Sequence, residues 1–259
     1  MRRVWMVLGA VLSAGLVGCG GGGGSSSGSD TCGPEFRTPN YVTDRDPIDN
    51  SVNLILRWPA FPLGIFFAND ETFLDGATTV TASSRTREGA ARWTTATANG
   101  ITFRDSTSAS GADIVVTFNR LANRPGNGDV LGLTRVTYFP SSGTIVKAEI
   151  TINTWPGMTR AEFVNGMRDT STHELGHALF LQGHSANNGD VMYWTSASDD
   201  DRALSTRDIN SVLTAYCGTF RSRDRRDGTP LGLPGEQPVT IEMHCRMNAP
   251  CRPGCTQSH

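Results

Sequence analysis

The chain has 259 residues, which is enough for one domain of about 150 to 200 residues with extensions. Its 23 basic and 25 acidic residues give a formal net charge of −2, and Lys147 is its only lysine. Because this composition offers no basic stripe that could neutralise a phosphate backbone, we do not expect nucleic acid as a partner.

The first 18 residues have the features of an export signal. Two arginines precede an apolar run from residue 4 to residue 17, which is too short for a membrane span. The run ends in Leu16-Val17-Gly18-Cys19, which resembles the bacterial lipobox, and this resemblance implies that Cys19 is lipidated and becomes the new N-terminus. We therefore expect an exported protein, lipid-anchored to a bacterial membrane on its periplasmic or cell-surface face. The alternative is an ordinary signal peptide with a chance cysteine.

Glycine and serine dominate residues 20–30, which cannot bury apolar surface and are expected to form a flexible tether. Five further cysteines follow Cys19, and in an exported protein cysteines usually pair as disulfides. Cys32 and Cys217 are candidates for one disulfide across the ends of the main domain, and disulfides are also expected among Cys245, Cys251 and Cys255. Since five is an odd number, one thiol should stay free.

The main domain shows strand and helix patterns in alternation. Strands are expected at residues 63–68, 101–103, 112–118 and 145–152, from their apolar and β-branched runs. A helix is expected over residues 82–98, and a Gly/Asn-rich loop over 122–132. Two capping boxes, Thr159 to Glu162 and Ser205 to Asp208, predict the starts of two further helices.

Three of the five histidines lie within twelve residues, at His173, His177 and His184. Residues four apart on a helix share a face and lie about 6 Å apart, so His173 and His177 can both reach one zinc ion at about 2.0 to 2.1 Å. Glu174 lies beside this pair, where it can accept a proton from water acidified by the ion and return it to a leaving amine. The pattern predicts a hydrolytic zinc site with Glu174 as general base.

The third ligand requires the chain to turn back. If the helix continued, His184 would lie about 10.5 Å beyond His177 at a rise of 1.5 Å per residue, too far to share the ion. Gly183 can adopt positive φ and stands where the turn is needed. We therefore expect a turn at Gly183 that returns His184 to the metal.

These residues, followed by Asp190-Val191-Met192-Tyr193, resemble the metzincins and among them matrixin-like peptidases, whose signature is HExxHxxGxxH followed by a methionine turn. The similarity extends to Arg57-Trp58-Pro59 and to residues 204–209, and covers about residues 52–218. In two departures, Phe180 replaces the family's glycine and His184 comes one residue late. The resemblance implies that Met192 packs beneath the metal without binding it.

The resemblance also implies an α+β fold with a twisted, mixed and mostly parallel sheet, an active-site helix and a C-terminal helix. We assign residues 1–18 to the signal peptide, 19–36 to the lipidated cysteine and tether, 37–218 to the metzincin-like catalytic domain, and 219–259 to a cysteine-containing tail. The implied activity is that of a zinc-dependent endopeptidase acting on proteins or peptides, which would pair with an exposed edge strand within residues 130–153. The alternatives are a zinc-binding surface lipoprotein with little or no peptidase activity, and a structural lipoprotein whose motif is accidental.

One catalytic Zn²⁺ is the expected cofactor. The histidines that bind a second, structural zinc in matrixins have no counterparts here, and Ca²⁺ binding by the loop at 122–132 is undetermined. Cys32-Gly33 invites comparison with the cysteine by which a matrixin propeptide blocks its zinc, although an oxidising compartment favours a disulfide. Neither the oligomeric state nor the substrate preference follows from the sequence.

Overall fold

The apolar and β-branched segments form a mixed sheet in the computed structural model, which describes residues 37–217 and 232–247. Within these residues the sheet has seven strands in the order β10-β11-β7-β8-β6-β2-β5. The strands are β2 (Leu63–Phe67), β5 (Phe103–Asp105), β6 (Ile114–Arg120), β7 (Val130–Phe139), β8 (Thr144–Thr154), β10 (Thr195–Ser196) and β11 (Val239–Met247). Neighbours from β5 to β8 are parallel, whereas β7 is antiparallel to both β8 and β11.

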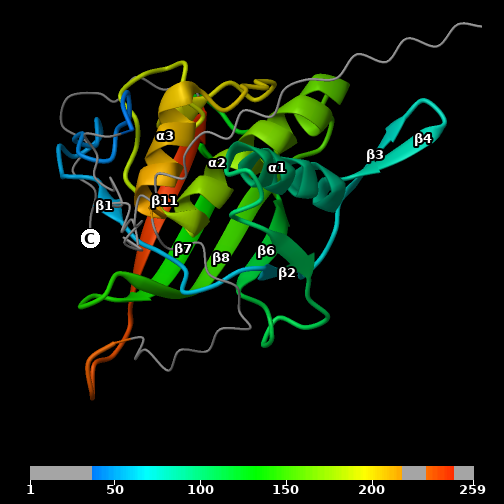
Figure 1. Cartoon of the computed structure of the whole chain (residues 1–259). Helices are drawn as coiled ribbons and strands as arrows, with labels where there is room; N and C mark the ends of the chain where they lie inside the picture. The colour runs from blue at the N-terminus through cyan, green and yellow to red at the C-terminus, as the bar shows by residue number, and fades with distance from the viewer. Residues whose placement is uncertain (1–36, 218–231, 248–259) are drawn as a thin grey trace, which may run out of the picture. The chain divides into compact units, whose positions relative to one another are not determined.

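Helices α1 (Ala82–Ala96) and α2 (Met167–Leu179) lie over one face of this sheet (Figure 1). The Thr81 hydroxyl caps α1 by accepting from the amide of Ser84 at 3.1 Å. At Gly89 the two helices approach so closely that an added Cβ would lie 3.0 Å from the backbone of Thr172. Helix α2 packs closely against α1 and the sheet, and every residue of α2 except Arg168 is buried.

The remaining elements are short. Strand β1 (Leu54–Ile55) pairs antiparallel with β9 (Leu181–Gln182), directly after α2. Strands β3 (Thr72–Asp75) and β4 (Thr78–Thr81) form a hairpin. Helix α3 (Thr206–Ala215) begins at the expected capping box, in which Ser205 and Asp208 exchange hydrogen bonds. No helix within residues 37–217 and 232–247 is both long and apolar enough to cross a membrane.

The expected α+β class with a twisted mixed sheet is confirmed. Three details differ from the expectations. The hairpin at residues 72–81 was not expected, and the loop placed at 122–132 ends at Asp129, where β7 begins. The edge of β7, which we expected to be exposed, is covered. Strand β11 comes from the segment assigned to the tail and pairs with β7 from Val130 to Tyr138 (Figure 1).

Candidate metal centre

The active-site helix begins at the capping box expected from the sequence. The Thr159 hydroxyl accepts from the amide of Glu162 at 3.2 Å, and the Glu162 carboxylate accepts from the amide of Thr159 at 2.8 Å. The first turn, η2 (Glu162–Gly166), is a π-helical turn that continues directly into α2. At this junction an added Cβ on Gly166 would overlap the backbone of Ser198, which explains the glycine.

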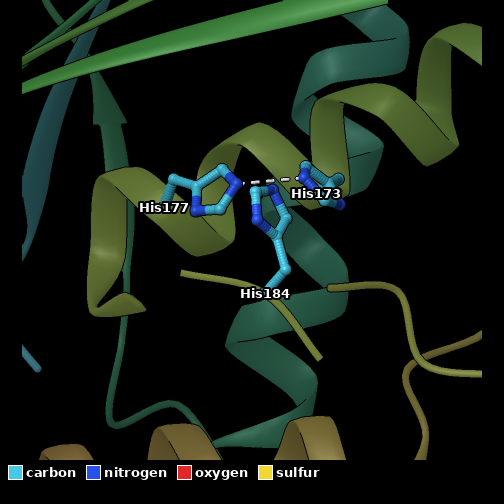
Figure 2. A group of neighbouring side chains, drawn as sticks. All are labelled: His173, His177 and His184. Carbon is cyan, nitrogen blue, oxygen red and sulfur yellow. Dashed lines mark hydrogen bonds between the residues drawn. The ribbon is translucent and has the colours of Figure 1, made fainter. Parts of the chain in front are cut away.

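Three imidazoles converge beneath the sheet (Figure 2). His173 and His177 project from α2, four residues apart, and their Nε2 atoms lie 3.0 Å from each other. His184 reaches the same point from the loop after β9, and ligand atoms of the three rings all lie within 4.8 Å of one another. All three side chains are buried. The structure thus brings together the three histidines expected from the sequence.

Each imidazole is oriented by a hydrogen bond on its other nitrogen. The Nδ1 atom of His173 bonds to the carbonyl of Val191 at 2.7 Å, and that of His177 to the carbonyl of Leu181 at 2.8 Å. The Nδ1 atom of His184 bonds to the carboxylate of Asp46 at 2.8 Å. Since carbonyl and carboxylate oxygens only accept, each Nδ1 carries the proton and each Nε2 presents a lone pair.

This arrangement fits a cation. Three lone pairs that face one another without a donor repel, and His184 Nε2 is buried with no hydrogen-bond partner. Tetrahedral zinc with bonds of about 2.0 to 2.1 Å would hold its nitrogens about 3.3 Å apart, close to the separation of His173 and His177. Desolvation lowers the pKa of both histidines, that of His177 to about 3, so both rings are neutral and ready to bind a metal.

The turn that returns His184 lies where the sequence indicated. Helix α2 ends at Leu179, two residues pair in β9, and Gly183 then adopts φ +136°. An added Cβ there would lie 2.9 Å from the side-chain carbon Cγ of Asn53, so both the backbone angle and the space require glycine. The Asn53 amide donates to the carbonyls of Tyr41 and His184 and so holds this turn in place.

The methionine turn packs against α2. Met192 is fully buried, and an added Cβ on Gly176 would lie 2.9 Å from its methyl carbon. The Asp208 carboxylate, at the start of α3, accepts from the amides of Val191 and Met192. Since Val191 also accepts the His173 hydrogen bond, α3 indirectly orients a ring of the site. Met192 therefore packs against the helix that carries two of the three histidines, and its role as a floor beneath the metal stays a prediction.

Glu174 lies between the helix and β7. Its Oε2 accepts from the Thr134 hydroxyl at 2.6 Å, whereas Oε1 has no hydrogen-bond partner. The carboxylate packs over Gly132, where an added Cβ would lie 2.7 Å from Glu174 Cγ. Burial raises the pKa of Glu174 to about 8, while the Thr134 hydroxyl and the nearby amide of Cys245 act in the opposite direction. A buried carboxyl with one free oxygen is suited to exchange protons near neutral pH.

Three residues of the site were missed by sequence reasoning. Asp46 lies 138 residues before His184, and no local pattern links the two. Thr134 belongs to a strand that we expected only as part of an edge. Cys245, for which we expected a disulfide, is instead a free and buried thiol, and its Sγ, His173 and Glu174 have ligand atoms within 4.8 Å of one another. The sequence signal that could have found Cys245 was the odd number of cysteines after Cys19, which predicts that one thiol stays free.

Some expectations lie outside the described residues. These include the lipidated Cys19 and the proposed disulfide partner Cys32, so both stay predictions. The undetermined calcium site at 122–132 also stays open, although the Asp129 carboxylate is engaged by the amide of Gly126 at 2.7 Å.

Comparison with known proteins agrees with this geometry. The family model Peptidase_M10, described as matrixin, matches residues 75–217, which include the helix α2, the three histidines and the methionine turn. No curated protein matches the chain.

Proposed function

Because the chain belongs to the matrixin family, we propose that it is a zinc-dependent endopeptidase that hydrolyses internal peptide bonds of proteins. The observation that carries this proposal is the convergence of three Nε2 lone pairs beside a buried carboxylate with one unpartnered oxygen. Three histidine nitrogens are the protein ligand set of a catalytic zinc, whereas a structural zinc takes four protein ligands.

His173, His177 and His184 would hold the zinc ion, which when bound supplies a Lewis acid for the scissile carbonyl and for water. Asp46 and the carbonyls of Val191 and Leu181 keep the proton on each Nδ1. These contacts fix both the tautomer and the ring orientation, so little reorganisation is needed when the metal binds.

Glu174 would act as the general base. Its unpartnered Oε1 is the atom that can take a proton from the attacking water, and the same atom can pass that proton to the leaving amine. The Thr134 hydroxyl holds the other carboxylate oxygen and so fixes the direction in which Oε1 faces. The fully buried Met192 would pack beneath the ligands, as the family resemblance implies.

The proposal is tested on the purified full chain by measuring bound zinc and the cleavage of a peptide library, with and without a chelator. We expect one zinc per chain, and activity that the chelator abolishes. Glu174→Gln should keep the zinc and lose cleavage, whereas His184→Ala should weaken zinc binding. Zinc without cleavage under any condition would favour the alternative of a zinc-binding surface protein, and full activity in Glu174→Gln would refute the assigned base.

A further inference from the structure

The side chains of the metal centre are almost completely buried in this structure. His173, Glu174 and His177 have no exposed surface, and His184 is exposed by only 1%. A peptide bond must reach both the metal and Glu174, so an element that covers the site has to move before hydrolysis.

Strand β11 is the element that covers it. It lies between β7, to which it is antiparallel, and β10, to which it is parallel. Its residue Cys245 pairs with Gly132, the glycine over which Glu174 packs. Since residues directly opposite on paired strands project to the same face, the Cys245 side chain faces α2 and the metal centre. This agrees with the 4.8 Å limit among ligand atoms of His173, Glu174 and Cys245.

The contacts of β11 are those of an added edge strand. On its solvent face, Glu242 pairs with Arg135 at 2.7 Å and the hydroxyls of Thr240 and Thr137 lie 2.8 Å apart. Both pairs are partly or fully exposed, and such contacts contribute little stability. Two attachments hold the strand: the backbone ladder with β7, which an extended peptide can also form, and the packing of Cys245 and Met247 in the hydrophobic core.

The space beside the strand supports the same interpretation. A cavity of about 590 Å³ extends from His184 along residues 240–244 of β11, with the segment 46–54 as its opposite wall. Strand β11 therefore forms a wall of a cavity that reaches the third histidine.

We propose that β11 is an inhibitory strand, the chain's own occupant of the peptide-binding edge, and that its Cys245 thiolate is a fourth ligand of the metal. The proposal rests on the proposed function, since it concerns the same ion and the same groove. Four protein ligands close a zinc site, whereas catalysis needs a position open for water or substrate. Binding as thiolate releases the thiol proton to solvent as the metal binds.

The unpartnered atoms at the site favour such a ligand. His184 Nε2 and Glu174 Oε1 are both buried and lack hydrogen-bond partners. A cation held by the three histidines would satisfy His184 Nε2 directly. Among the described residues the thiol forms a group with His173 and Glu174, and His173 is the member that this group shares with the group of the three histidines.

The test compares the full chain with variants that release the strand or remove the thiol. Successive amides of a strand point to opposite edges, so the double substitution Glu242→Pro and Met243→Pro removes at least one hydrogen bond to β7. The matched control, Glu242→Gln with Met243→Leu, changes the same side chains and keeps both amides. Cys245→Ser removes the thiol and leaves the strand paired.

Three readouts are used: the thiolate-to-metal absorption band of the Co²⁺-loaded protein, labelling of Cys245 by a thiol reagent mapped by mass spectrometry, and peptide cleavage. We expect wild type and the matched control to show the band, protect Cys245 and cleave slowly. The proline pair should lose the band, label Cys245 and cleave about tenfold faster. Cys245→Ser should bind Co²⁺ without the band and cleave faster than wild type.

The inhibitory strand is refuted if the Co²⁺-loaded wild type lacks the band. It is also refuted if the wild type cleaves the peptide and the proline pair, with Cys245 labelled by the reagent, cleaves it no faster. Absence of cleavage in every variant, with Co²⁺ bound and the strand released, would instead refute the proposed peptidase function. The two failures are therefore distinguishable.

Discussion

Asp46 gives the sharpest test of how the metal centre is built. Its carboxylate accepts the Nδ1 proton of His184 at 2.8 Å, and both side chains are almost fully buried. In Asp46→Ala this N–H would be buried without an acceptor, at a cost of about 1 to 3 kcal/mol, and the ring would lose its orientation. Loss of such an outer contact typically weakens metal binding about 10- to 100-fold, or about 1.4 to 2.7 kcal/mol.

The assay is competition for zinc between the protein and a chelator of known affinity. Asp46→Asn keeps an oxygen acceptor and should lose less affinity than Asp46→Ala. Asp44→Ala is the control, because it removes a carboxylate from the same segment that pairs with Arg207 and does not touch His184. Wild-type zinc affinity in Asp46→Ala would refute the reasoning, and equal losses in Asp44→Ala would assign the effect to the fold of the segment.

Three further predictions concern Glu174, Gly132 and Cys19. In the metal-free protein the buried Glu174, with its pKa raised to about 8, keeps a proton that the unfolded chain has already lost, so stability should fall by roughly 1.5 kcal/mol from pH 6.5 to 8. Urea unfolding should show this fall in wild type and not in Glu174→Gln. Below about pH 6.5 the lowered pKa of His177 has the opposite effect, because it makes the stability rise with pH. Gly132→Ala would crowd the Glu174 carboxylate, so cleavage should drop about 100-fold while zinc affinity changes little, and unchanged kcat would contradict this packing. Cys19→Ser should move the protein from the membrane fraction to the soluble fraction, and unchanged attachment would exclude the lipid anchor.

Features set by local spacing could be predicted from the sequence. The pair His173 and His177 follows from helical periodicity, and both capping boxes form as their residue types indicated. The four expected strands correspond to β2, β5, β6 and β8, with boundaries shifted by one or two residues. Local hydrogen bonding and alternation decide these elements, so a short window of sequence contains the relevant information.

Features set by distant contacts could not be predicted. Strand β11 carries Glu242, His244 and Arg246 in alternation, which is typical of a half-exposed strand, but its partner lies about 100 residues earlier and is not marked locally. The hydrogen bond from His184 to Asp46 likewise depends on how the chain closes. The expected disulfide at Cys245 was wrong because the composition of the tail suggested covalent links, whereas packing against the sheet buries the thiol.

The departure from the family signature and the presence of Asp46 have a common structural origin. Phe180, in the place of the usual glycine, is buried against Trp93 with ring centroids 5.7 Å apart, so it ends α2 by packing and not by a tight turn. The chain then continues through β9, and its pairing with β1 brings the segment that contains Asp46 beside His184. The additional residue before His184 thus gives the length that β9 needs. Because the turn at Gly183 also contacts Asn53 of this segment, the third histidine is held by contacts outside the motif, which explains why the motif alone left its geometry open.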